Sequence, residues 1–322
     1  MKILYVTTFL VLSTGLFFTA CSNDEDTISD EIVIPDEEVV EPVPLQISVS
    51  IAELTRSFIT ESGFKDNTSI GVSMMYVNGE DYGEGNKNQK YTSVGIGTNQ
   101  VWKSAADVKV SSRSGYAVAC YPYSEKNNDF TAIPIDNKDC VDYMYGSVAH
   151  VNRDKPQACL VMRHAMAGIM VRFSKTENYA GDESISNIRV SSKALGKKAV
   201  LNALKGTISN IENLNAALNF EETFTSITTN PEETSTEMIT AVPNINEKVD
   251  MTLSFQIGQA ENSIDIVENV AFAMGKIYVI DVEFRPGKLV VSNVSIYELP
   301  NRLLAVIFGA LVIIAGTYIK RS

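Results

Sequence analysis

The stretch ACLVMRHAMAGIMVRF, residues 158–173, decides the fold class, because it is a long apolar run that predicts a buried β-strand. Shorter runs lie on both sides of it. They alternate between apolar and polar residues or are wholly apolar, and turns such as Arg285-Pro286-Gly287 separate them. This spacing predicts an all-β body of antiparallel sandwiches instead of alternating strands and helices. The further strands that we expect are Gln46–Ser50, Ser69–Val77, Tyr116–Tyr123, Val249–Ile257, Ile277–Phe284 and Lys288–Tyr297.

The chain is long enough for two domains. It has 322 residues, which allows two domains of ordinary size, each with its own core. Glu, Asn, Gly and Asp cluster at Thr176–Glu183, directly after the long apolar run, and such a cluster is typical of a connection. We therefore predict β-sandwich domains at residues 46–178 and 179–298. One helix-like stretch, Ile208–Leu218, is rich in Asn and is equally consistent with a loop.

The amino terminus has the features of an export signal. Lys2 provides a positive start, an apolar stretch follows, and small residues precede Cys21. A Cys directly after small residues resembles the lipobox of bacterial lipoproteins, although Phe18 stands where Leu is usual. We predict a lipoprotein signal peptide at residues 1–20 and lipid, such as palmitate, on Cys21. The alternative is an ordinary signal peptide followed by a Cys that carries no lipid.

Residues 21–45 are expected to form an acidic tether. No Lys or Arg occurs between Ile3 and Thr55, so most of the formal net charge of −12 lies in this segment. An acidic segment that contains Pro repels itself and stays extended. In the rest of the chain, acidic and basic residues are nearly equal in number and no stripe of basic residues occurs, which argues against a nucleic acid as partner. The acids of the tether are Asp24, Glu25, Asp26, Asp30, Glu31, Asp36, Glu37, Glu38 and Glu41.

The three remaining cysteines, Cys120, Cys140 and Cys159, cannot all pair within one chain. Their spacing is unlike that of a metal site. A disulfide between Cys120 and Cys140 is one alternative. The other is that the thiols are free and buried in strands, which we favour because Cys120 and Cys159 lie in apolar runs.

The carboxyl-terminal tail is more apolar than the rest of the chain. Leu303–Ile319 contains no charged residue, and as a helix it would span about 26 Å, just short of a hydrocarbon core of about 30 Å. We predict an apolar, membrane-seeking helix at residues 303–319. The alternatives are a sorting signal that is later removed, a β-branched donor strand, and a tail that replaced the original end of the gene.

The chain lacks the sequence patterns of common catalytic and cofactor sites. It contains no HExxH motif, no dinucleotide-binding glycine fingerprint, no phosphate loop and no nucleophile elbow. Asp136, Asp139 and Asp142 could bind calcium, but their spacing is not that of an EF-hand, and a solvated loop is the interpretation that we favour. We therefore predict no catalytic residue, no cofactor and no metal, and we do not expect an enzyme.

Two groups of residues have a functional and a structural interpretation. His164 lies in the long apolar run, and we favour a packed or hydrogen-bonded strand residue over a catalytic one. Trp102 and nearby tyrosines could form a platform for sugars, but such aromatic residues more often belong to a core or a sandwich edge. These tyrosines are Tyr116, Tyr121, Tyr123, Tyr143 and Tyr145.

Several segments, taken in order, resemble the fimbrillin family of Bacteroidetes, the subunits of type V pili. Thr55-Arg56, followed by Ser69-Ile70-Gly71-Val72, is similar to the opening of the family. The resemblance covers residues from about 45 to 298. The other matching elements are the Y-P-Y strand at Gly115–Tyr123, the D-x-L-Y-G element at Asp142–Gly146, the F-x-H-A strand at Leu160–Ala167, and the second-half segments Met238–Pro243 and Gly275–Val279.

The resemblance implies two consecutive transthyretin-like β-sandwich domains and assembly by strand exchange. In the family, a surface lipoprotein precursor is cut after an Arg near the start of the first domain, and a strand of a neighbouring subunit fills the exposed groove. Arg56 is the candidate processing site here, because it is the first basic residue after Lys2. The released strand would include Leu45–Ile51. The alternative is a first strand that stays in place, as in anchor subunits, which keep their lipid.

Together these observations predict a lipid-anchored, surface-exposed protein of the outer membrane that acts as a structural or adhesive subunit of a fimbrium. Its expected partners are other pilin subunits and the membrane, the latter through Cys21 and the tail at residues 303–319. That tail departs from the family, whose pilins end in short alternating strands. The alternative function is a lipid-anchored surface protein that binds glycans or host proteins without polymerising.

Overall fold

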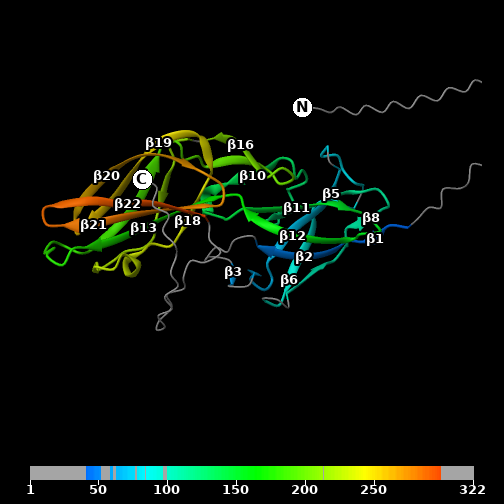
Figure 1. Cartoon of the computed structure of the whole chain (residues 1–322), viewed down its shortest axis with the longest axis horizontal. Helices are drawn as coiled ribbons and strands as arrows, with labels where there is room; N and C mark the ends of the chain where they lie inside the picture. Colours follow the sequence, from blue (N-terminus) through cyan, green and yellow to red (C-terminus); the bar gives the residue numbers. More distant parts are fainter. Residues whose placement is uncertain are drawn as a thin grey trace, which may run out of the picture. The chain divides into compact units, whose positions relative to one another are not determined.

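The computed structural model describes residues 41–51, 59–60, 63–76, 78–83, 85–96, 100–212 and 214–298, and these residues form an all-β structure of several sheets (Figure 1). The helical segments in this part of the chain are two short 3-10 turns, η2 (Asn137–Asp139) and η3 (Pro231–Thr234). The predicted all-β class is therefore confirmed. Five of the predicted features lie wholly or mostly outside the described residues: the signal peptide, Cys21, the acidic tether as far as residue 40, Arg56 and the apolar tail at 303–319.

A seven-stranded sheet organises the amino-terminal half. All of its neighbouring strands are antiparallel except β2 and β12, which are parallel. Two short pairs accompany it: β1 (Val43–Pro44) with β8 (Lys109–Val110), and β3 (Ile59–Thr60) with β4 (Gly63–Phe64). The order across the sheet is β2 (Gln46–Ile51), β12 (Gln157–His164), β11 (Met144–Val151), β9 (Gly115–Tyr121), β5 (Ser69–Met75), β6 (Gln89–Val94) and β7 (Val101–Ser104).

The central strands of this sheet are buried on both faces. One face carries a core that includes Ile70, Val72 and Leu160. On the other face, Val118 and Cys120 of β9 belong to a second core. A three-stranded sheet completes this second core, with the order β10 (Ile133–Asp136), β15 (Lys198–Asn202) and β16 (Thr207–Glu212). Burial on both faces explains why the runs at β5 and β9 are almost continuously apolar.

Two four-stranded sheets pack face to face in the carboxyl-terminal half. Their shared core contains an aromatic cluster in which the ring of Phe173 lies 5.3 Å from that of Phe255 and 6.2 Å from that of Phe284. One sheet has the order β18 (Ile239–Ala241), β13 (Ala167–Lys175), β21 (Lys276–Arg285) and β22 (Lys288–Glu298). The other has the order β17 (Ala217–Asn219), β14 (Ile185–Ser192), β19 (Asn244–Ile257) and β20 (Ala260–Phe272).

The apolar run at 158–173 forms two strands, and the prediction of one long strand is wrong. β12 ends at His164 and belongs to the seven-stranded sheet, whereas β13 begins at Ala167 and pairs with β18 and β21. Both halves are apolar because both enter a core. The residues between the two strands, Ala165 and Met166, are buried as well, so no polar residue in the sequence indicates where the chain passes from one sheet to the other. The sheet therefore changes at residues 165–166, before the cluster at Thr176–Glu183; the domain boundary at 178 stays a prediction.

The helix-like stretch Ile208–Leu218 also differs from the expectation of a helix or a loop. It contributes to β16, which pairs with β15, and to β17, which pairs with β14. Asn210 and Asn215 have φ angles of 49° and 62°. Asn tolerates this left-handed conformation better than most residues, which explains the Asn-rich composition without a helix. In the part of the chain that the structure describes, no helix is long and apolar enough to cross a membrane.

Candidate functional site: the edge strand β2

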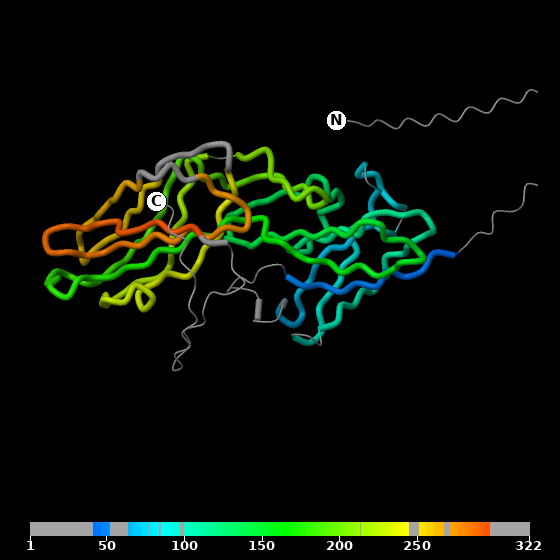
Figure 2. Tube along the Cα trace, viewed as in Figure 1, coloured from blue at the N-terminus to red at the C-terminus, as the bar shows by residue number. Residues whose placement is uncertain are grey.

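β2 forms one edge of the seven-stranded sheet (Figure 2). Its backbone pairs with one strand, β12, and it also lies close to β4 and β7. The two strands are parallel, and their register pairs Gln46 with Gln157 and Ile51 with Met162. The paired residues are 111 positions apart in the sequence, so no local turn joins the two strands. Among the described strands, β2 thus has a hydrogen-bonded partner on one side only, and a strand edge of this kind can be exchanged.

The two faces of β2 differ. Ile47, Val49 and Ile51 are half-buried and pack against the amino-terminal core, whereas the polar residues between them are exposed. Leu45, just before the strand, is only 4 % exposed, and its backbone N–H donates to the carbonyl oxygen of Val108 over 2.7 Å. The predicted alternation, with Leu45, Ile47 and Val49 on one face, is confirmed.

β12 provides the surface that β2 covers. Its inward residues Ala158, Leu160 and Met162 are all at most 1 % exposed, and they belong to the same core as the apolar face of β2. Without β2, these side chains would lose one wall, and the backbone of β12 would lose its partner on that side. Unpaired strand edges with exposed apolar surface favour the addition of another strand.

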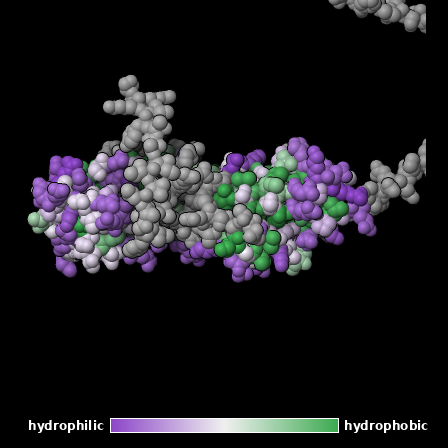
Figure 3. Space-filling model, turned by 60° about the horizontal axis from the view of Figure 1, so that its bottom comes forward, coloured by the Kyte–Doolittle hydropathy of each residue, from purple (hydrophilic) through white to green (hydrophobic). Residues whose placement is uncertain are grey.

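The opposite edge of the same sheet is apolar at its surface. Strand β7 and its neighbour β6 carry Val94, Ile96 and Val101 in and beside their hairpin, with 41, 60 and 50 % of each residue exposed. Figure 3 shows hydrophobic surface on the half of the molecule that contains this sheet. Contiguous apolar surface on a soluble protein commonly marks a contact with another protein.

The aromatic residues considered as a sugar platform lie in or against cores. Trp102 packs edge-on against Phe64 with 5.4 Å between ring centroids, and Tyr121 packs against the same ring at 5.7 Å. Phe64 itself is only 1 % exposed. Tyr116, Tyr143 and Tyr145 pack against the second core. The structural interpretation is therefore confirmed for these five residues, whereas Tyr123 lies outside the cores and its ring centroid is 5.3 Å from Lys90 Nζ.

His164 and Asp142 form a buried pair. His164 Nδ1 and Asp142 Oδ2 share a hydrogen bond of 2.7 Å, and the two side chains are 1 and 4 % exposed. This confirms the interpretation of His164 as a hydrogen-bonded strand residue. Asp142 faces the histidine, while Asp136 caps η2 by accepting from the backbone N–H of Lys138. Among the described residues no group of three or more His, Cys, Asp and Glu side chains could hold a metal ion.

The three cysteines of the described part are free thiols. Cys120 is buried, and burial raises the pKa of its thiol to about 12. Cys140 lies in the turn after η2 and is half-buried, which also raises its pKa. The expectation of a buried thiol is wrong for Cys159. Alternate residues of β12 point to opposite faces, so Cys159 is exposed on the face that β12 turns away from the core.

Sequence reasoning identified the apolar face of β2 but not its partner. Neither the parallel pairing nor the choice of β12 has a signal in the sequence, because several runs alternate in the same way. Arg56 lies five positions after the last residue of β2, within a segment outside the described residues. The structure accordingly places the strand predicted to be released and leaves its processing site as a prediction.

Comparisons with known proteins identify a family and a fold for this chain. The sequence profile of the fimbrillin-like family matches residues 55–298. A crystal structure from Bacteroides uniformis, described as that of a "putative cell adhesion protein", has a TM-score of 0.63 and 16 % identity; the match covers 80 % of this chain and 99 % of that one. A structure from Bacteroides ovatus with the same description has a TM-score of 0.59 and 15 % identity, and covers 80 and 98 % of the two chains. A search of curated proteins found no match.

Proposed function

The chain belongs to the fimbrillin-like family, and on that premise we propose that it is a structural or adhesive subunit of a cell-surface fimbrium that assembles by strand exchange. The observation that carries this proposal is β2, an edge strand with one apolar face and one hydrogen-bonded neighbour. A strand of this kind can be replaced by a strand of another subunit with the same alternation. Members of this family are not known as enzymes, and we assign no catalytic residue.

The proposed assembly begins with a lipid-anchored precursor. Lipid on Cys21 would hold the chain in the outer membrane, since each buried methylene contributes about 0.8 kcal/mol and several acyl chains together give firm anchoring. The acidic tether, predicted at residues 21–45, would keep the body away from the surface, except that its last residues, 43–45, pack on the amino-terminal half. Two transthyretin-like sandwich domains, at residues 46–178 and 179–298, would form the body of the subunit.

Cleavage after Arg56 would then free β2. The segment from residue 41 to 56 contains β1 and β2, which pair with β8 and β12. Once it dissociates, the groove on β12 is open to a strand of a neighbouring pilin. An uncut chain would keep both β2 and the lipid, as expected of an anchor subunit at the base of a fimbrium.

The test is expression of the full chain in a Bacteroidetes host, with and without the substitution Arg56→Gln. We expect the wild type to form polymers that resist mild detergent and begin at residue 57, and Arg56→Gln to remain a membrane-bound monomer. Arg189→Gln, which removes an exposed Arg from β14 in another sheet, is the matched control and should polymerise normally. Polymers that begin at Cys21 would contradict release of β2. An absence of polymers in every variant would exclude a polymerising subunit.

A further inference from the structure

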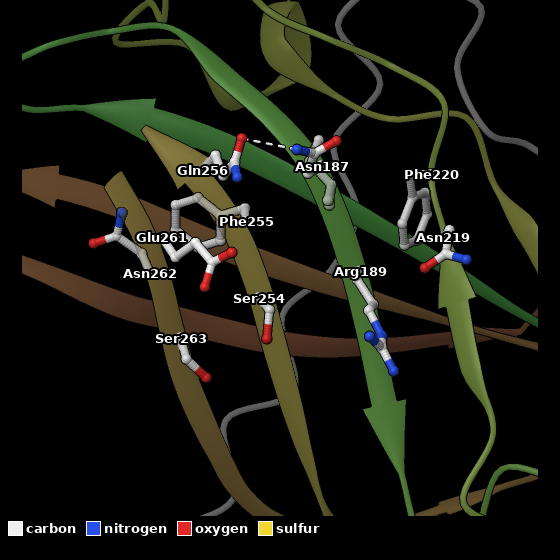
Figure 4. A pocket seen from close by; sticks show the side chains of 11 residues that line it. Asn187, Arg189, Asn219, Phe220, Ser254, Phe255, Gln256, Glu261, Asn262 and Ser263 are labelled. Carbon is white, nitrogen blue, oxygen red and sulfur yellow. Dashed lines mark hydrogen bonds between the residues drawn. The ribbon is translucent and has the colours of Figure 1, made fainter. Parts of the chain in front are cut away.

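A polar hollow lies on the outer face of the sheet formed by β17, β14, β19 and β20. Its volume is about 630 Å³, within the range of typical ligand pockets. The inner face of the same sheet carries Val190, Leu253 and Phe255 into the core, so the polar residues of the hollow point away from it. Figure 4 shows how the lining side chains project from the four strands.

One polar residue from each strand forms a row across the hollow. Arg189 of β14 pairs in register with Asn219 of β17 on one side and with Ser254 of β19 on the other, and Ser254 pairs with Ser263 of β20. Neighbouring strands are about 4.8 Å apart, so the row is roughly 14 Å long. A row of this length could contact an oligosaccharide and is longer than a single ion needs. Arg189 is the second residue of the row, between Asn219 and Ser254.

A β-bulge shapes the end of the hollow beside this row. The register of β14 and β19 shifts between Ser186 and Arg189, and Asn187 in the bulge has a φ angle of 51°. Asn187 Nδ2 donates to Gln256 Oε1 over 2.8 Å, as the dashed line in Figure 4 shows. This bond fixes both amides and leaves Gln256 Nε2 as a donor and Asn187 Oδ1 as an acceptor. Bulges often redirect side chains next to binding sites.

The hollow contains two charged side chains, those of Arg189 and Glu261. Among the described residues, the side chain of Arg189 has no hydrogen-bonding or ion-pair partner, and neither has the side chain of Glu261. By contrast, Arg172 on the other sheet is bound to Asp281 and Glu232. An Arg that is free within a row of amides and hydroxyls can bind a carboxylate through two parallel hydrogen bonds.

We propose that this hollow binds an acidic glycan, with Arg189 holding the carboxylate of a sugar acid. Amide and hydroxyl side chains both donate and accept hydrogen bonds, as sugar hydroxyls do. The sugar hydroxyls would therefore bind to the amides of Asn187, Asn219 and Gln256 and to the hydroxyls of Ser254 and Ser263. Glu261 restricts the ligand to a single negative charge near Arg189, because a second anion would be repelled. Eight of the eleven lining residues are polar or charged, and the other three are Ile188, Phe220 and Phe255, a composition that favours a sugar over a wholly apolar ligand.

The test measures binding to the full chain in mild detergent by titration calorimetry. The acidic probes are 3′-sialyllactose and a hyaluronan disaccharide, and lactose is the neutral control. We expect saturable binding of at least one acidic probe, and binding of lactose that is at least tenfold weaker. Arg189→Gln should weaken binding of the acidic probe at least tenfold, whereas Arg163→Gln, which removes the same charge from another sheet, should leave it unchanged.

A second variant separates recognition from folding. Asn219→Ala removes a neighbour of Arg189 in the row and should weaken the acidic probe without changing the thermal unfolding temperature. The proposal is overturned if neither acidic probe binds the wild type, if lactose binds as tightly as the acidic probe, or if Arg189→Gln retains full affinity. Because the measurement needs no polymer, its outcome is independent of the proposed assembly by strand exchange.

Discussion

A single substitution can lock β2 to its neighbour. Ser48 of β2 lies opposite Cys159 of β12 in the parallel register, and both residues are exposed. Neighbouring strands are about 4.8 Å apart, which is within the Cα separation of ordinary disulfides. We therefore expect Ser48→Cys to form a disulfide with Cys159 under mild oxidation, without displacing the apolar face of β2.

The expected gain in the free energy of unfolding follows from the length of the loop that the disulfide would close. Residues 48 and 159 are 111 positions apart (159 − 48 = 111), and closing a loop of this length removes about 4.8 kcal/mol of unfolded-state entropy at room temperature. Engineered disulfides usually deliver less, so we expect a gain of about 2–4 kcal/mol in the free energy of unfolding. For a chain of this size, that corresponds to a rise of roughly 5–10 °C in the unfolding temperature, which reduction should abolish.

The assay compares oxidised and reduced protein in thermal unfolding and in polymer formation. Ser50→Cys is the matched control, because Ser50 lies two positions farther along β2 and pairs with Val161. Its Cα is roughly 8 Å from that of Cys159, too far for an unstrained disulfide. Oxidised Ser48→Cys should remain monomeric even after cleavage at Arg56, and should polymerise once reduced. If the oxidised protein polymerises like the wild type, β2 is not the exchanged strand; if only Ser50→Cys cross-links, the register is wrong.

Three further predictions concern the rest of the chain. Cys159 should react with a thiol reagent near neutral pH in the native protein, whereas Cys120 should react only after unfolding, because it is buried and its pKa is raised to about 12; equal labelling, quantified by mass spectrometry, would contradict this. Arg172→Met should lower the free energy of unfolding by about 2–3 kcal/mol in a denaturant titration, since Arg172 binds both carboxylate oxygens of Asp281; no change would show that the pair contributes little. Removal of Leu303–Ser322 should leave the unfolding temperature and polymer formation unchanged, and a loss of polymers that added tail peptide restores would identify the tail as the donor strand.

The strands with local signals could be predicted well. Lys276–Arg285 and Lys288–Glu298 pair as a hairpin across Pro286-Gly287, close to the expected ranges. Gly287 has a φ angle of 73°, which explains why a glycine ends the predicted turn. β2 was predictable for a similar reason, because its alternation reflects one core face and one solvent face.

Features that depend on distant partners could not be predicted. The parallel contact of β2 with β12 and the passage from β12 to β13 involve strands whose sequences would fit several neighbours. The polar hollow is another example: Arg189 and Ser254 are 65 positions apart in the sequence (254 − 189 = 65) and come together only through the pairing of β14 with β19. In each case the sequence determines which residues face the core, while the topology determines which residues meet.

The geometry of β2 also limits which strand can replace it. Its groove accepts apolar side chains at Leu45, Ile47, Val49 and Ile51, and the residues between them face solvent. A donor must therefore alternate, because a one-residue shift would turn its apolar side chains outward. The tail at residues 303–319 is apolar at nearly every position, so as a strand it would expose one apolar face. This mismatch favours a donor strand from another pilin. The tail would then insert into a membrane or act as a sorting signal.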